Sequence, residues 1–148
     1  METLGPVLVV LGRVLSGFSL AFLVPLVWAW GLGETALLRV WASGFAGTLT
    51  AGVMLSLLTR RFRRELQPKD GFLLVTLVWI TLPACAALPL LHSVPRMDAA
   101  GAYFEAMSAL TATGATVIAG LDHLPVSINV WRCFLQYVGG LGIIVLVV

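Results

Sequence analysis

A short polar strip, TATGATVIAG at residues 111–120, lies between two apolar stretches of this sequence. It places Thr111, Thr113, Gly114 and Thr116 within six positions. Threonine hydroxyls and backbone carbonyls are oxygen ligands, and glycine permits backbone angles that turn carbonyls toward one side of a chain. In selective filters, rings of carbonyls replace the hydration shell of a cation. The strip therefore predicts a backbone that coordinates a dehydrated cation. An ordinary threonine-glycine turn in a loop is the alternative interpretation.

Three charged residues flank the strip. Glu105 lies before it, where an unpaired carboxylate inside a membrane would be costly. We expect Glu105 to be hydrogen-bonded and to hold the strip, and direct attraction of ions is the alternative. Asp122 lies at the predicted outer mouth, where it either concentrates cations or is a solvated loop residue. Arg132 is expected to anchor at the membrane interface or to pair with Asp122 or Glu105.

The segment before the strip, AAGAYFEAMSAL at residues 99–110, predicts a short helix that Asp98 caps. Twelve helical residues reach about 18 Å, whereas the hydrocarbon core of a bilayer is about 30 Å thick. The helix cannot cross a membrane, yet it is too apolar for water. We therefore predict a re-entrant pore helix whose C-terminal dipole end favours a cation, followed by a strip that returns to the same side.

The composition predicts an integral membrane protein. Of the 148 residues, 59% are hydrophobic and only 11% are charged. The net charge of +2 argues against nucleic acid as a partner, and no catalytic constellation or metal-ligand spacing is present, so we expect neither an enzyme nor a metal site. The apolar segments lie at about residues 6–30, 36–58, 71–91 and 126–148.

The basic loop TRRFRRELQPKD, residues 59–70, predicts the orientation. Lysine and arginine favour the cytoplasmic side, which places the N-terminus in the cytoplasm and residues 31–34 outside. Because no basic region or cleavage site precedes the first apolar segment, we expect that segment to remain as an anchor.

Smaller features complete the predicted packing. Arg13 and Arg39 lie near span ends, where long side chains reach the headgroups, and both cysteines are expected to be buried in apolar segments. Small residues and tryptophans predict close helix contacts and an outer aromatic belt. The contact residues are Ser43, Gly47, Ala51, Gly139, Gly140 and Gly142, and the belt residues are Trp28, Trp30, Trp41 and Trp131.

Three segments together resemble the first repeat of the Trk/Ktr/HKT potassium transporters, and the Trk branch fits best because two further helices precede the repeat. The segments are DGFLLVTLVWITLPACAALPLL, DAAGAYFEAMSALTATGATVIAGLDHLP and WRCFLQYVGGLGIIVLVV. The resemblance implies an all-α polytopic membrane protein with two domains. Residues 1–69 would form two transmembrane helices and the basic loop, and residues 70–148 a helix–pore helix–filter–helix repeat.

By position, the resemblance implies that Gly114 is the filter glycine and that Thr111, Ala112 and Thr113 supply the carbonyls before it. Ala115 and Thr116 complete the filter segment 111–116 as supporting residues. The implied function is potassium transport in a bacterial inner membrane, without a cofactor. Implied partners are a second copy of the full-length protein and cytosolic nucleotide-binding regulatory subunits.

One filter strip cannot encircle an ion, and the family has four repeats in one chain. Residue 148 lies inside the second helix of the first repeat, so we expect this sequence to be the N-terminal part of such a transporter. A non-conducting truncated membrane interaction module is the alternative, and a small homotetrameric channel subunit is a weaker one.

Overall fold

A computed structural model describes residues 4–62 and 67–147 of the chain. Arg63 and Arg64 of the predicted basic loop lie outside these ranges. The first three residues, which belong to the predicted cytoplasmic N-terminus, and Val148, the last residue of the predicted fourth segment, also lie outside them. Within the described ranges all regular secondary structure is helical, which confirms the predicted all-α class. In chain order the elements are α1 (Leu4–Ser19), η1 (Leu20–Phe22), α2 (Leu23–Gly31), α3 (Thr35–Thr59), η2 (Arg60–Phe62), α4 (Pro68–Ser93), α5 (Ala99–Leu110), η3 (Leu121–His123) and α6 (Val126–Val147).

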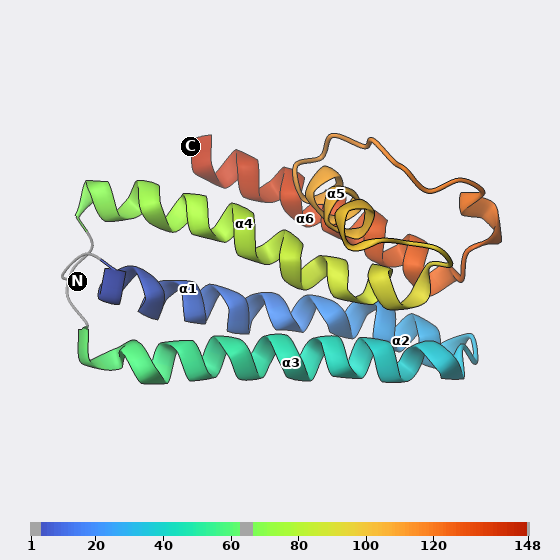
Figure 1. The fold of residues 1–148 in the computed structure, drawn as a ribbon, viewed down its shortest axis with the longest axis horizontal. Coiled ribbons are helices and arrows are strands. Elements are labelled where there is room, and N and C mark those ends of the chain that lie inside the picture. Colours follow the sequence, from blue (N-terminus) through green and yellow to red (C-terminus); the bar gives the residue numbers. More distant parts are fainter. Residues whose placement is uncertain (1–3, 63–66, 148) are drawn as a thin grey trace.

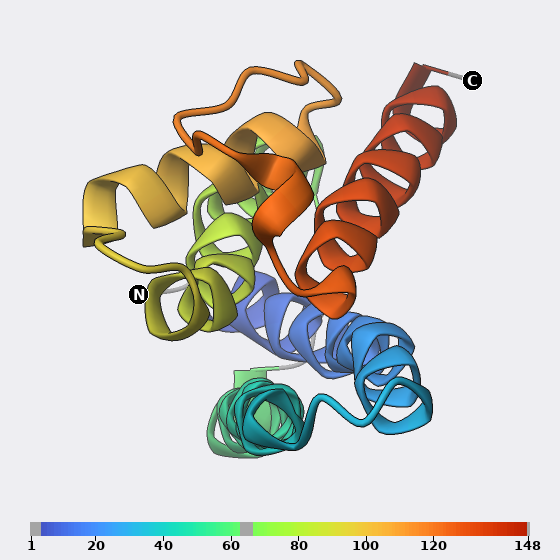
Figure 2. The same ribbon diagram turned by 90° about the vertical axis from the view of Figure 1, so that its right-hand side faces the viewer.

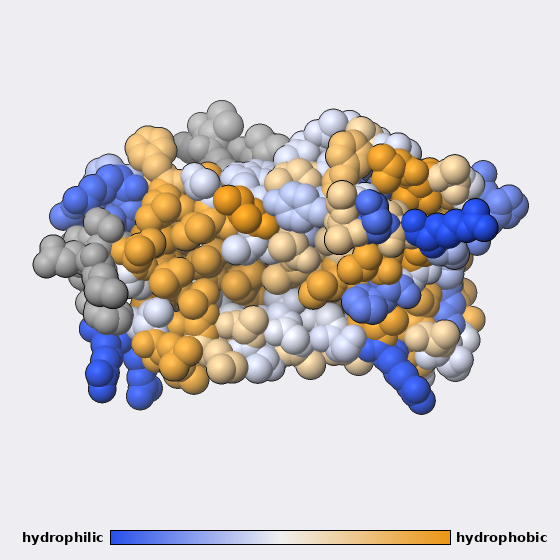
Figure 3. All heavy atoms as spheres, viewed as in Figure 1, coloured by the Kyte–Doolittle hydropathy of each residue, from blue (hydrophilic) through white to orange (hydrophobic). Residues whose placement is uncertain are grey.

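Three stretches are long and apolar enough to cross a membrane, namely Leu4–Gly31, Thr35–Thr59 and Pro68–Ser93. They run side by side along the long axis of the molecule, with α1 packed against both α3 and α4 (Figure 1). Hydrophobic residues cover much of the middle of one face, whereas strongly hydrophilic residues gather toward the two ends (Figure 3). The chain is therefore a multi-pass membrane protein.

The first span is not one continuous α-helix, because the 3-10 turn η1 separates α1 from α2. Pro25 has no N–H to donate to the carbonyl four residues earlier, which belongs to Ala21 inside η1. The third span is longer than the predicted residues 71–91. Pro68 occupies its first turn, and Gln67 and Asp70 form a reciprocal capping box in which the Gln67 N–H donates to Asp70 Oδ2 at 3.0 Å.

Close contact between α1 and α3 depends on two glycines. A Cβ built on Gly12 would lie 2.6 Å from the Gly52 carbonyl oxygen, and a Cβ on Gly52 would lie 2.7 Å from the Gly12 carbonyl oxygen. The buried small residues of α3 are Gly44, Thr48 and Gly52. The predicted contact stripe of Ser43, Gly47 and Ala51 is exposed, so that prediction was wrong by one position. Adjacent helical positions differ by about 100°, which turns the predicted stripe away from α1.

Two tryptophans predicted for the aromatic belt are core residues instead. Trp41 and Trp131 are fully buried, with ring centroids 5.7 Å apart. Their indole N–H groups donate inside the protein, from Trp41 to Ser127 Oγ and from Trp131 to the Ala86 carbonyl oxygen, both at 3.1 Å. Trp28 and Trp30 are exposed. Burial of an indole requires such a partner for its N–H, and sequence position alone does not reveal one.

The expectation of two buried cysteines was also wrong in part. Cys85 is partly buried, but Cys133 is exposed, and neither forms a disulfide. Position 133 is two residues from the buried Trp131, a rotation of about 200° around α6 that places it on the opposite face.

The glycine contact between α1 and α3 gives a matched pair of variants. Gly52→Ala would put a methyl group 2.6 Å from Ser16 Oγ, whereas Gly47→Ala meets no atom within 4 Å. We expect Gly52→Ala to destabilise the full-length protein by about 1–3 kcal/mol through overpacking and Gly47→Ala to have little effect. Thermal unfolding of the two purified variants in detergent measures the difference. Equal unfolding temperatures would contradict the close α1–α3 packing.

Candidate functional site

The polar strip begins where α5 ends, on one side of the bundle. Asp98 caps α5, and its Oδ1 accepts a hydrogen bond from the Gly101 N–H at 2.9 Å. α5 lies across the long helices rather than along them, nearly end-on in one view and lengthwise in the other (Figures 1 and 2). From the end of α5, residues 111–120 run back toward the end of the molecule that carries η3 (Figure 1).

The backbone of the strip turns at two residues with positive φ. Ala112 has φ 55° and Gly114 has φ 75°. Such angles favour glycine, so Ala112 is held in this conformation by its surroundings. The Thr113 N–H donates to the Ser108 carbonyl oxygen at 2.9 Å, and the Ser108 hydroxyl donates to the Ala115 carbonyl oxygen at 2.7 Å. Ser108, near the end of α5, therefore holds the strip through these two hydrogen bonds.

The carbonyl oxygens of residues 111–114 accept no hydrogen bond from the part of the chain that the structure describes. Residues 112–117 are exposed on this chain. The hydroxyls of Thr111 and Thr113 contact each other at 2.8 Å, and the Thr111 hydroxyl also donates to the Met107 carbonyl oxygen at 2.8 Å. The backbone oxygens, rather than the threonine hydroxyls, are thus the groups left available for a ligand.

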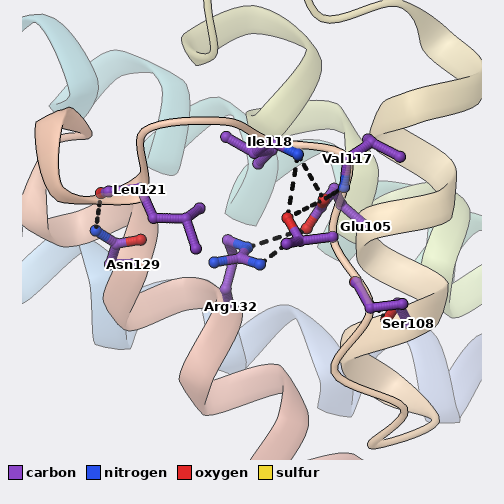
Figure 4. Close-up of polar contacts among 9 residues, drawn as sticks. Glu105, Ser108, Val117, Ile118, Leu121, Asn129 and Arg132 are labelled. Carbon is purple, nitrogen blue, oxygen red and sulfur yellow. Dashed lines mark hydrogen bonds and ion pairs between the residues drawn. The ribbon is translucent and has the colours of Figure 1, made fainter.

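A buried carboxylate holds the far half of the strip. Glu105 is 1% exposed, and its Oε1 accepts hydrogen bonds from the Thr116 hydroxyl at 2.5 Å and from the Val117 and Ile118 N–H groups at 2.6 and 3.3 Å. Its Oε2 faces Arg132 of α6, with Nε at 3.1 Å and Nη2 at 3.0 Å (Figure 4). A carboxylate that accepts this many hydrogen bonds and pairs with a guanidinium is well satisfied despite its burial.

The residue predicted for the outer mouth makes no contact with this carboxylate. Asp122 is exposed in η3 and forms no ion pair within the described ranges, so Arg132 pairs with Glu105 and not with Asp122. The Asn129 side-chain amide donates to the Leu121 carbonyl oxygen at 2.9 Å and ties η3 to α6 (Figure 4). Among the described residues no group of three or more His, Cys, Asp or Glu side chains could hold a metal ion.

Two contacts position α6, one against α5 and one against the start of α3. A Cβ on Gly139 would lie 1.9 Å from the Leu110 carbonyl oxygen, so only glycine fits where α6 passes the end of α5. Among the described residues a Cβ on Gly140 or Gly142 would meet nothing within 4 Å, so within that part of the chain only Gly139 has the packing role predicted for the three glycines. At the other end of α6, Glu34 Oε1 accepts from the Val126 N–H at 2.8 Å.

Sequence reasoning missed Ser108 and Glu34. Ser108 lies three residues after Glu105, and this spacing on one helix face is a signal that could have identified it. Glu34 and Val126, which form a hydrogen bond, are 92 residues apart in the sequence, and no local pattern predicts that contact.

Glu105→Gln tests the buried carboxylate. Glutamine keeps the shape but removes the charge that Arg132 faces, and breaking a buried ion pair costs about 3–5 kcal/mol. We expect the thermal unfolding temperature of the full-length protein to fall clearly for Glu105→Gln, while the exposed control Asp122→Asn leaves it unchanged. A Glu105→Gln protein as stable as the wild type would show that the strip does not depend on this carboxylate.

Comparison with known proteins identifies the family. The family model described as TrkH, cation transport protein, matches residues 38–148. The Trk system potassium uptake protein TrkH of Vibrio parahaemolyticus is 42% identical over 144 residues, which is 94% of this chain and 29% of that protein. The Escherichia coli K12 protein of the same name is 42% identical over 127 residues, which is 85% of this chain and 25% of that protein.

A solved structure agrees in fold. The crystal structure of the potassium transporter TrkH from Vibrio parahaemolyticus superposes with a TM-score of 0.86 at 41% identity, covering 99% of this chain and 31% of that one. This chain thus spans less than a third of the length of the curated relatives it matches. The match to the family model covers most of the residues, and the chain belongs to the TrkH family of cation transport proteins.

Proposed function

We propose that this chain forms the N-terminal part of a Trk-type potassium uptake protein and that residues 111–116 form one of the four segments of its cation filter. The observation that carries the proposal is the row of carbonyl oxygens at residues 111–114, which accept no hydrogen bond within the described ranges. They belong to a strip that the end of α5 holds in place and that is exposed at residues 112–117. Relatives with 42% identity are named potassium uptake proteins, and their family is one of transport proteins rather than enzymes.

In the proposed arrangement α5 is the re-entrant pore helix, and α4 and α6 are the two helices of the first repeat. The span made of α1 and α2, followed by α3, precedes that repeat. The end of α5 is the negative end of its dipole and lies at the start of the strip, which favours a cation there. The three missing sides of the filter come from the remainder of the full-length protein.

Transport in this proposal is passive or gated movement of dehydrated K⁺, which is the cargo and not a cofactor. Carbonyl oxygens replace part of the hydration shell, and binding must be weak enough for release. Because Ser108 and Glu105 fix the strip by hydrogen bonds, and Arg132 in turn holds Glu105, the strip's carbonyls do not need to reorganise when an ion arrives. Asp122 would lie at the outer mouth of the path. The full-length protein would be a dimer that binds cytosolic nucleotide-binding subunits.

Gly114→Ser tests the filter assignment. The nearest atom to a Cβ at position 114 is Gln136 Nε2 at 3.5 Å, so there is room for a side chain. The positive φ of 75° is unfavourable for serine, by about 1–2 kcal/mol, and relaxation of that strain would rotate the neighbouring carbonyls. We expect weaker discrimination of K⁺ over Na⁺ in flux measurements on the full-length transporter.

Ala119→Ser is the matched control, since Ala119 is exposed, has no positive φ and lies outside the proposed filter segment 111–116. It adds the same hydroxyl five residues later, and we expect it to keep the wild-type selectivity. If Gly114→Ser also kept that selectivity, residue 114 would not be part of the filter.

We also propose that the N-terminus lies in the cytoplasm of a bacterium and that η3 lies on the outer side of the inner membrane. In a background with Cys85 and Cys133 replaced by alanine, a cysteine at position 123 should react with an impermeant maleimide added to intact cells. A cysteine at position 61 should react only after the cells are opened. Both positions are exposed on this chain. The reverse labelling pattern would overturn the orientation.

A further inference from the structure

A groove between α3 and α4 lies apart from the proposed ion path. It has a volume of 350 Å³, within the size range of small-molecule sites. Arg39, Ser43 and Gly44 line it from α3, and Leu88, Pro89 and His92 line it from α4. Both helices are membrane spans, so a ligand in this groove would come from the bilayer.

The groove has a basic rim and an apolar interior. Arg39 is four residues after the start of α3, about 6 Å along its axis, and His92 is the second-last residue of α4. The two residues therefore lie at the same end of the bundle, at the depth where headgroups are found. Gly44 and Leu88 lie farther from that end, and most of the groove surface is apolar.

The cation at the rim has no partner among the described residues. Arg39 is exposed and forms no hydrogen bond or ion pair with any residue that the structure describes. His92 Nδ1 is 2.7 Å from the Leu88 carbonyl oxygen, so that nitrogen carries a proton and Nε2 is not engaged by the contact. A guanidinium beside an apolar groove is complementary to a molecule with an anionic head and a hydrocarbon chain.

We propose that this groove binds an anionic phospholipid, with the phosphate held by Arg39 beside His92 and one acyl chain lying along Gly44 and Leu88. Gly44 and Leu88 line the apolar part of the groove, and the Phe22 ring fills the space that a side chain at Gly44 would take, 2.8 Å from where a Cβ would lie. The site does not depend on the proposed ion path, and its failure would leave the filter assignment untouched.

Lipid binding to the purified full-length protein tests the proposal, with phosphatidylglycerol and phosphatidylcholine titrated separately and bound lipid counted by native mass spectrometry. We expect phosphatidylglycerol to bind more tightly and Arg39→Gln to weaken its binding about fivefold, the effect of one basic residue near a membrane surface. Arg39→Lys should retain most of the affinity. Arg13→Gln is the matched control, because Arg13 is also an exposed arginine on a span but is not among the residues that line this groove.

Leu88→Trp keeps both basic residues and fills the groove, so it should also weaken phosphatidylglycerol binding. Equal losses from Arg13→Gln and Arg39→Gln would overturn the site, because they would indicate general surface charge. A preference for phosphatidylcholine would overturn it as well. Ser43→Cys gives a third test: formation of disulfide-linked dimers through this position would show that a second copy of the protein, and not a lipid, covers the groove.

Discussion

The hydrogen-bonded carboxylate of Glu105 is the interaction on which the arrangement of the strip depends. The strip has no regular secondary structure, so its backbone groups need partners from elsewhere. One oxygen of Glu105 satisfies two backbone N–H groups and a threonine hydroxyl, and the other oxygen faces Arg132. A single side chain thereby joins α5, the strip and α6. The free energy cost of burying the Glu105 charge is offset by the hydrogen bonds from the strip together with the ion pair to Arg132.

Close packing of α6 brings Arg132 and Glu105 together. Gly139 lets α6 approach the end of α5, and this close approach places Arg132, two helical turns earlier, within reach of Glu105. Trp131, about 100° around α6 from Arg132, contacts Phe22 and Trp41 of the first two spans. The first two spans therefore contact α6 one residue away from the arginine that holds Glu105.

Local features of the sequence were sufficient to predict the helical segments and the strip. Asp98 precedes a helix too short to cross a bilayer, and Gly114 stands among threonines where a positive φ is required. Contacts that depend on rotation about a helix axis were not predictable in the same way. Small residues occur at two adjacent registers of α3, and only the tertiary structure selects the one that contains Gly52.

The sequence also left the ion-pair partner of Arg132 undetermined. Arg132 had two candidate carboxylates, and the structure selects Glu105 because the start of α6 passes beside the middle of α5. The burial of Trp131 follows from the same geometry, since its N–H finds a carbonyl on α4. Periodicity and composition contain no information on distances between residues 27 or 45 positions apart.

The contact between Glu34 and the start of α6 also bears on the order of biosynthesis. Glu34 precedes Val126 by 92 residues, which at 5–20 residues per second is a delay of roughly 5 to 20 seconds on the ribosome. The acceptor for the unpaired N–H groups of α6 is thus already synthesised when that helix emerges. Glu34, between the first two spans, can therefore bind the start of α6 as soon as that helix is synthesised. A chain begun after Glu34 would have to expose those N–H groups or find them another partner.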